Sequence, residues 1–236
     1  RCQSDGMSDG MSDGMATTTA RVEWLTIAGD LDTWRSLGLS ATDDGLIPLF
    51  GTALRIVSPE TAAAKTGGMG ATPEDVQAGI VGWALSGIDD TTTSIAGLTT
   101  TVVEQLAPIF ATHSLGARSI DHVVVMTGEL ESTTGDVARA TGCELKRIRE
   151  VGKIRQGFHR IGRGGLIVEV VQHEDDKRSV AEFWGLVIIV EDLDAACARL
   201  GPDRVGEPKD AVQPGRRIAT IRSCVGLGTA VALMSA

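Results

Sequence analysis

Three short stretches decide the fold of this chain: Gly29-Asp30-Leu31-Asp32, Gly128-Glu129-Leu130-Glu131 and Glu191-Asp192-Leu193-Asp194. Each stretch closes an apolar run and opens an amphipathic segment. The runs begin eight residues before the leucine of each stretch, at Glu23, His122 and Gly185. A strand-then-helix signal that recurs at a fixed spacing indicates duplicated structural units. We therefore expect the chain to repeat one unit.

The last unit shows this pattern most completely. Residues 183–190 are nearly all apolar, as in a strand that is covered on both faces. Asp192 stands at the expected N-cap of a helix, whose apolar stripe runs to Leu200 and which Gly201-Pro202 ends. The segments that follow predict three strands, over 203–212, 216–225 and 229–234. The predicted order of the unit is therefore β-α-β-β-β.

Residues 119–173 repeat this order, and the N-terminal half repeats it in part. The first of these units predicts a strand at 120–127, a helix at 129–141 and strands near 144–150, 153–161 and 165–172. The N-terminal half predicts a strand at 22–28, a helix at 30–38, strands near 46–50 and 52–58, a linker at 59–78 and a further strand around Trp83. After Asp90 the pattern fades, and the segment that follows fits no complete unit.

These units predict an α+β fold class, in which repeated βαβββ modules form curved mixed β-sheets. A chain of 236 residues that is 42% hydrophobic can bury two cores of ordinary domain size. We expect a degenerate N-terminal half over 18–117 and a C-terminal domain of two modules over 118–236. Residues 1–17 contain Ser-Asp-Gly-Met three times and are predicted to be a disordered leader.

Composition limits the classes of partner. The net charge of -9, with 31 acidic and 22 basic residues, disfavours nucleic acid and an anionic membrane surface. No apolar run reaches the roughly 18 residues of a membrane-spanning helix. The four cysteines show no paired spacing, which is typical of reduced thiols. We therefore expect a soluble cytoplasmic protein without a nucleic-acid or membrane partner.

Several motifs resemble the vicinal oxygen chelate superfamily, which includes glyoxalase I, bleomycin-resistance proteins and extradiol dioxygenases. They are the stretch from Val190 to Ala196, the strand from Ile120 to Val125, and Phe158-His159-Arg160-Ile161-Gly162 followed by residues 165–171. The resemblance is good over 118–236, fair over 20–58 and weak over 79–117. It implies that paired modules curl into a cleft, where a His on the first strand and a Glu on the last strand of each module hold a divalent metal.

One unit keeps both ligand types that the resemblance implies: His122 on its first strand and Glu169 on its last. In the last unit, the corresponding positions are Gly185 and, depending on register, Ala232 or Leu233. Metal sites built from nitrogen and oxygen donors normally need three protein ligands, so two residues alone do not complete such a site.

Glu23 stands where the first unit would carry its His. A metal set of His122, Glu169 and Glu23 is therefore expected if these units share a cleft. The cofactor would then be a divalent metal such as Zn, Ni, Mn or Fe.

His122 and Glu169 are the candidate catalytic residues. Glu169 interrupts an apolar run, where a carboxylate must be paired, protonated or exposed. A buried Glu beside a His would suit general base catalysis. The alternative for His122 is a hydrogen-bonded core histidine, and for Glu169 a purely structural pairing.

The strand predicted at 153–161 supplies the candidate substrate-binding residues. Gln156, Phe158 and Arg160 alternate onto one face, where they would meet an anionic or carbonyl-bearing ligand. The alternative is a solvated sheet face. Residues 162–165 join two strands instead of opening a helix, so they indicate a hairpin and no nucleotide cofactor.

Two classes of function remain open. The first is a glyoxalase-like lyase or isomerase that acts on a small oxygenated metabolite. The second is a binding protein of the bleomycin-resistance type, which sequesters a small molecule without turnover. An extradiol dioxygenase is a third hypothesis, disfavoured because Gly185 stands where a second His is wanted. The resemblance is also compatible with a homodimer, since dimers are common in such folds.

Overall fold

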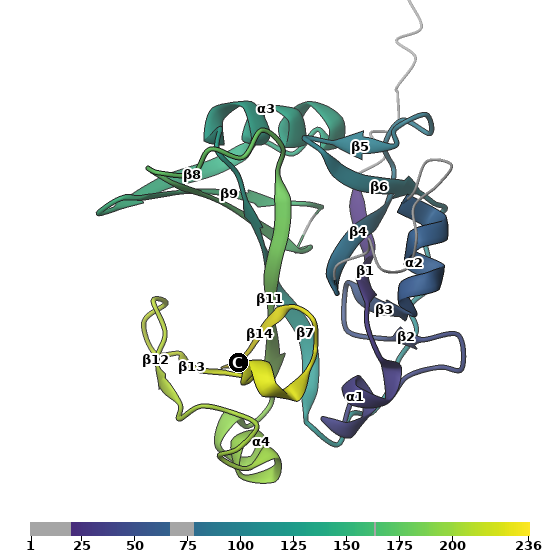
Figure 1. The fold of residues 1–236 in the computed structure, drawn as a ribbon, viewed down its shortest axis with the longest axis vertical. Helices are drawn as coiled ribbons and strands as arrows, with labels where there is room; N and C mark the ends of the chain where they lie inside the picture. Colours follow the sequence, from purple (N-terminus) through teal and green to yellow (C-terminus); the bar gives the residue numbers. More distant parts are fainter. Residues whose placement is uncertain (1–19, 67–77, 163) are drawn as a thin grey trace, which may run out of the picture.

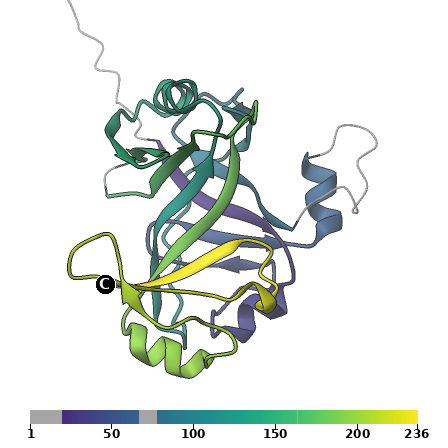
Figure 2. The ribbon, with the colours of Figure 1, turned by 60° about the vertical axis from the view of Figure 1, so that its left-hand side comes forward.

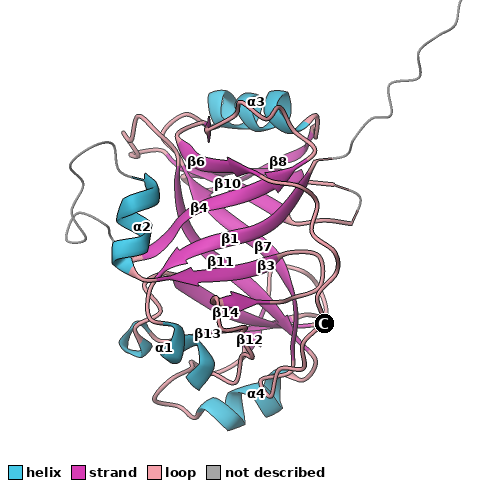
Figure 3. Cartoon of the chain, turned by 90° about the vertical axis from the view of Figure 1, so that its right-hand side faces the viewer, coloured by secondary structure: helices cyan, strands magenta, loops and turns pink. Residues whose placement is uncertain are grey.

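The structure, a computed structural model, describes residues 20–66, 78–162 and 164–236, so the predicted leader over 1–17 lies outside it. Two β-sheets lie beside each other (Figure 1). Helix α3 lies at one end of the sheets, α1 and α4 at the other, and α2 at the side (Figure 3). None of the helices in the described part of the chain is long and apolar enough to span a lipid bilayer.

The N-terminal sheet has six strands in the order β2-β3-β1-β4-β6-β5. They are β1 (Arg21–Ala28), β2 (Leu46–Ile47), β3 (Ala53–Val57), β4 (Gly79–Ser86), β5 (Ser94–Ile95) and β6 (Leu98–Val102). Strand β1 pairs parallel to β3, and β4 pairs parallel to β6. The antiparallel pair of β1 and β4 joins these two shortened modules.

The C-terminal sheet has eight strands in the order β12-β13-β14-β11-β7-β10-β9-β8. They are β7 (Ala117–Met126), β8 (Leu145–Val151), β9 (Ile154–Arg160), β10 (Ile167–His173), β11 (Glu182–Val190), β12 (Lys209–Asp210), β13 (Arg217–Thr220) and β14 (Ala230–Ser235). Within each module the first strand pairs parallel to the last, β7 with β10 and β11 with β14 (Figure 2). The sheet is curved, and both of its ends bend to the same side (Figure 1).

The anchor stretches begin helices, as expected. Helix α1 (Leu31–Ser36) follows Asp30, whose side chain accepts hydrogen bonds from Asp32 N and Thr33 N. Helix α4 (Leu193–Leu200) follows Asp192, whose side chain accepts from Ala195 N. Helix α3 (Leu130–Thr141) follows Glu129, which makes no such bond. A short Asp side chain at the N-cap satisfies an orphan N–H group of the first turn, which fixes where the helix starts.

The predicted βαβββ order is confirmed for both C-terminal modules, but two strands are shorter than expected. The strand predicted at 203–212 is reduced to β12, because Gly206 and Pro208 weaken pairing along this segment. The strand predicted at 216–225 ends at Thr220 and gives way to a short 3-10 helix, Ser223–Val225.

The N-terminal half also differs from the prediction. The predicted linker contains helix α2 (Pro59–Thr66), and the segment after Asp90, which fitted no complete unit, contributes β5 and β6. The strand expected near Trp83 is present as β4. Within the described residues, each N-terminal module thus lacks part of the full unit.

One large apolar core joins the two sheets and helices α1, α3 and α4. Its fully buried side chains include Trp34, Trp83, Leu130 and Ile188, each of which contributes about 1.5–3 kcal/mol by leaving water. A second, small cluster of Val187, Ile189 and Met234 is separate from this core. The C-terminal sheet therefore carries the main core on one face and a small apolar cluster on the other.

Candidate active site

Strand register places all five predicted C-terminal site residues on one face of the sheet. Ile167 on β10 pairs with His122 on β7 and with Arg160 on β9. Glu169 pairs with Phe158, and Val171 pairs with Gln156. Directly opposed residues project to the same side, and residues two apart along a strand share that side. His122 also pairs with Val187, a member of the small cluster, so this face is the one opposite the main core.

His122 and Glu169 lie in contact on this face. Nε2 of His122 is 3.4 Å from Oε2 of Glu169, and the two side chains are 15% and 13% exposed. Nε2 of Gln156 donates a hydrogen bond to Oε1 of Glu169. The carboxylate that interrupts the apolar run is therefore paired on both oxygens. This pairing meets the requirement that a nearly buried carboxylate has hydrogen-bond partners.

A β-bulge adds a residue to this site that the sequence did not reveal. Val187 pairs with His122 and the next residue of β11 pairs with Ile120, so Asp121 has no partner across the strands. Such an extra residue changes the direction of side chains on the bulged strand. Oδ2 of Asp121 is 2.8 Å from Nδ1 of His122, and Arg216 donates to Oδ1 of Asp121 over 2.8 Å.

Asp121 stays ionised in this arrangement. Burial raises its pKa, but the hydrogen bonds and charges of His122 and Arg216 outweigh burial and lower the pKa to about 2. An ionised carboxylate only accepts hydrogen bonds, so Nδ1 of His122 is the donor and Nε2 is directed at Glu169. Arg216, Asp121, His122, Glu169 and Gln156 thus form one continuous polar chain.

Two predicted substrate residues have other contacts on the same face. Arg160 donates to the carbonyl oxygen of Gly165 over 3.0 Å and has no acidic partner among the described residues. The ring of Phe158 carries the guanidinium of Arg147 at 4.6 Å, a cation–π contact. Arg160 therefore keeps capacity to bind an anion on this face, where Arg147 and Arg149 also lie.

Glu23 is not brought to the His122–Glu169 pair. It lies on β1 of the N-terminal sheet, where it accepts hydrogen bonds from Oγ of Ser86 and from the Leu106 amide. Within the described residues, no three His, Cys, Asp or Glu side chains gather as metal ligands would. The expected three-residue metal set is thus not assembled, because β1 and β7 belong to different sheets.

The corresponding positions of the last module cannot complete a metal centre. Glu169 lies two residues beyond the β10 partner of His122, and Ala232 lies two residues beyond the β14 partner of Gly185. Register thus selects Ala232 over Leu233 as the counterpart of Glu169. A Cβ at Gly185 would lie 2.5 Å from the carbonyl oxygen of Ala230. Neither position offers a donor, so the residues present do not fit the four-ligand site of the superfamily.

A pocket of about 780 Å³ lies at the Asp121 and Arg216 end of the polar chain, whereas His122, Glu169 and Gln156 are not among the described residues that line it. From the C-terminal sheet, Asp121, Arg216, Arg160 and Ile167 line it, and from the N-terminal half, residues 48–52 and 109–113 do. The N-terminal half thus forms one wall of the pocket.

The pocket wall is fixed by two sets of hydrogen bonds. The Phe50 amide donates to the Arg118 carbonyl over 2.8 Å, which docks this loop on β7. His113, for which the sequence indicated no role, accepts from the Ser40 amide at Nδ1, and its Nε2 lies 2.7 Å from the Pro48 carbonyl. His113 is therefore a structural histidine that holds the loop in place.

Comparison with known proteins identifies the fold. No family model and no curated protein sequence matches the chain. A solved structure of mutant 4-hydroxymandelate synthase from Streptomyces coelicolor matches with a TM-score of 0.59 and 12% identity, covering 92% of each chain. The chain has the vicinal oxygen chelate fold. At this identity, the vicinal oxygen chelate likeness shows architecture and not reaction.

Two smaller solved structures match about half of the chain. Methylmalonyl-CoA epimerase from Mycobacterium tuberculosis is 20% identical over 53% of this chain and 92% of its own, with a TM-score of 0.45. A variant of the Streptomyces coelicolor epimerase, solved with 2-nitronate-propionyl-CoA, is 20% identical over 50% of this chain and 93% of its own, with a TM-score of 0.40.

Proposed function

We propose that this protein is a glyoxalase-like isomerase or lyase that moves a proton on a small anionic, oxygenated metabolite. The observation that supports the proposal is the His122–Glu169 contact, held by Asp121 on one side and by Gln156 on the other. Two titratable groups in contact at a nearly buried position, joined through Asp121 to the wall of a pocket, are typical of acid–base sites.

In this mechanism, Arg160 binds the carboxylate or carbonyl oxygen of the substrate and offsets the charge that develops on it. Glu169 takes a proton from the adjacent carbon, and protonated His122 returns a proton to the neighbouring position. Asp121 orients the imidazole of His122 by accepting the hydrogen bond from Nδ1. After release of the product, the proton on Glu169 passes to Nε2 of His122 across the 3.4 Å contact, which restores both groups.

The proposed mechanism contains no metal step, because Gly185 and Ala232 supply no donors to complete the site. Metal analysis of protein purified without a polyhistidine tag tests the earlier expectation of Zn, Ni, Mn or Fe directly. One equivalent of metal that is lost in Glu169→Gln would overturn the metal-free mechanism.

Deuterium exchange from D2O into a panel of small 2-oxo and 2-hydroxy acids, followed by NMR, tests the proton transfer. We expect exchange into at least one compound, reduced about 10²- to 10⁴-fold in Glu169→Gln, as is typical when general base catalysis is lost. The exposed Glu207 supplies the matched control, because Glu207→Gln changes the same group away from the pocket and should leave exchange unchanged. Equal loss in both variants, or exchange that persists in Glu169→Gln, would contradict the assignment.

A non-catalytic binding protein is the second candidate. It is favoured by the fact that His122 and Glu169 satisfy each other and that their counterparts in the last module carry no polar group. Binding of an acid from the panel without exchange, weakened by Arg160→Ala, would support this function and contradict the first. Cytoplasmic location and dimer formation remain predictions.

A further inference from the structure

A second pocket, of about 650 Å³, surrounds Glu23. Residues from both halves of the chain line it, including Ile161 and Leu166 from the turn between β9 and β10. Glu23 holds the same place in its module that His122 holds in the third module, eight residues before the anchor leucine. The proposed acid–base site does not use Glu23.

The carboxylate of Glu23 is buried but not saturated. Its side chain is 4% exposed, Ser86 Oγ donates to Oε1 over 2.6 Å, and the Leu106 amide donates to Oε2 over 3.2 Å. Nε of Arg21 lies 3.7 Å from Oε1, which is too long for a hydrogen bond but close enough to offset the charge. Each carboxylate oxygen accepts about two hydrogen bonds, so acceptor capacity remains on both.

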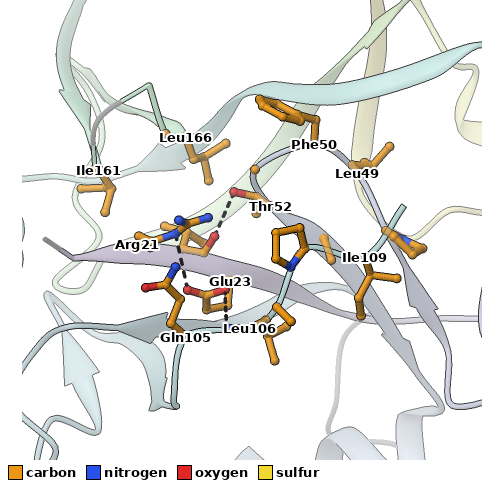
Figure 4. Close-up of a pocket in the computed structure, with 18 of the residues that line it drawn as sticks. Arg21, Glu23, Leu49, Phe50, Thr52, Gln105, Leu106, Ile109, Ile161 and Leu166 are labelled. Atoms are coloured by element: carbon orange, nitrogen blue, oxygen red, sulfur yellow. Dashed lines mark hydrogen bonds and ion pairs between the residues drawn. The ribbon is translucent and has the colours of Figure 1, made fainter. Parts of the chain in front are cut away.

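The rest of the pocket is mainly apolar. Arg21, Glu23 and Gln105 lie together on one side, and Leu49 and Ile109 lie on the other (Figure 4). Among the described residues that line the pocket, Arg21 and Glu23 are the charged ones, and their charges cancel. The described lining residues therefore leave no unpaired charge to offset the charge of a charged ligand.

We propose that this pocket binds an uncharged, mainly apolar small molecule through a hydroxyl group that donates a hydrogen bond to Glu23. The apolar side chains contact the body of the ligand, and the ionised carboxylate supplies a strong, charge-assisted acceptor. This site is distinct from the one proposed around His122, although residues 48–52, 109–110 and 164–166 border both pockets.

Three matched probes test the proposal: 4-phenylbutan-1-ol, 4-phenylbutylammonium and 4-phenylbutyrate. Calorimetric titration of the full chain should show the alcohol binding most tightly. Glu23→Gln should weaken binding of the alcohol by about tenfold, because a neutral acceptor replaces an ionised one. It should strengthen binding of 4-phenylbutyrate, because Arg21 loses its counter-ion. Tighter binding of a charged probe to the unmodified protein, or no change in Glu23→Gln, would overturn the proposal.

A second measurement does not depend on the variant. The amide resonance of Leu106 reports on Glu23, because this N–H donates to its carboxylate. Titration with the alcohol should shift this resonance in the unmodified protein, and a saturating amount without a shift would overturn the proposal. Glu207→Gln is the matched control for the loss of a carboxylate. His122→Asn should leave binding of the alcohol unchanged, because His122 does not belong to the Glu23 pocket. A negative result for the Glu23 pocket can therefore be told apart from a negative result for the proposed acid–base site.

Discussion

Glu23 and His122 occupy the same position in two modules but have different surroundings. His122 lies on the face of its sheet opposite the main core, between Asp121 and Glu169. Glu23 lies in a pocket lined by both halves, held by Ser86 and by the Leu106 amide. The comparison shows that the repeated module sets where a side chain stands, whereas the neighbouring strands and loops set its chemistry.

The largest effect on stability is expected from Glu23→Ala. Removal of the carboxylate leaves the Ser86 hydroxyl and the Leu106 amide without their buried acceptor, at a cost of about 3 kcal/mol. Urea unfolding followed by circular dichroism measures this change. Glu207→Ala is the control on an exposed carboxylate and should change the free energy of unfolding by less than about 0.5 kcal/mol. Similar values for both variants would show that Glu23 is not a structural acceptor.

Gly185 occupies in the last module the position that Glu23 and His122 occupy in theirs. Gly185→Ala tests why this position carries no side chain. The added Cβ would approach the Ala230 carbonyl oxygen to 2.5 Å, so β11 and β14 must separate, at a cost of about 2 kcal/mol. Gly135→Ala is the control, since a Cβ there meets no atom within 4 Å. It should be neutral or stabilising because Gly135 lies in helix α3. A Gly185→Ala variant as stable as the unmodified protein would contradict the close strand approach.

Asp121→Asn tests the polar chain through the dependence of stability on pH. The pKa of Asp121 is lowered from 3.8 to about 2 in the fold, so its contribution is complete above about pH 4 and is lost as the pH falls toward 2. This shift corresponds to about 2 kcal/mol. Unfolding free energies measured between pH 2 and pH 5 should show a smaller loss in Asp121→Asn than in the unmodified protein. Parallel curves would mean that Asp121 is not held ionised by His122 and Arg216.

The smallest effect concerns the helix starts, where the modules also differ. Asp192→Ala should cost about 1 kcal/mol, because the side chain accepts from the Ala195 amide. Glu129→Ala, at the same position of the third module, should change stability by only a few tenths of a kcal/mol, because Glu129 makes no capping bond. Equal effects in thermal unfolding would show that the anchor acid works in the same way in both modules.

The sequence predicted the C-terminal half better than the N-terminal half. The two βαβββ modules and the helix over 129–141 were expected from the regular alternation and the capping residues along the chain. The pair of His122 and Glu169 was expected from the resemblance to the vicinal oxygen chelate superfamily, and the two side chains are in contact. Helix α2 was missed and the strand at 203–212 was predicted too long, because Ala, Gly and Pro signals compete there without a clear period. The sequence shows that Asp121 and His122 are neighbours, but it does not reveal the β-bulge that changes the direction of their side chains.

By itself, the sequence determined the repeated module and the residue types that stand at its first and last strands, since burial period and helix capping are local properties. Only the tertiary structure decided that Arg216 reaches Asp121, that Glu23 lies apart from His122, and that the N-terminal loops complete a pocket. These contacts join residues far apart in sequence, and they depend on strand register and sheet packing, which no short stretch of the chain specifies.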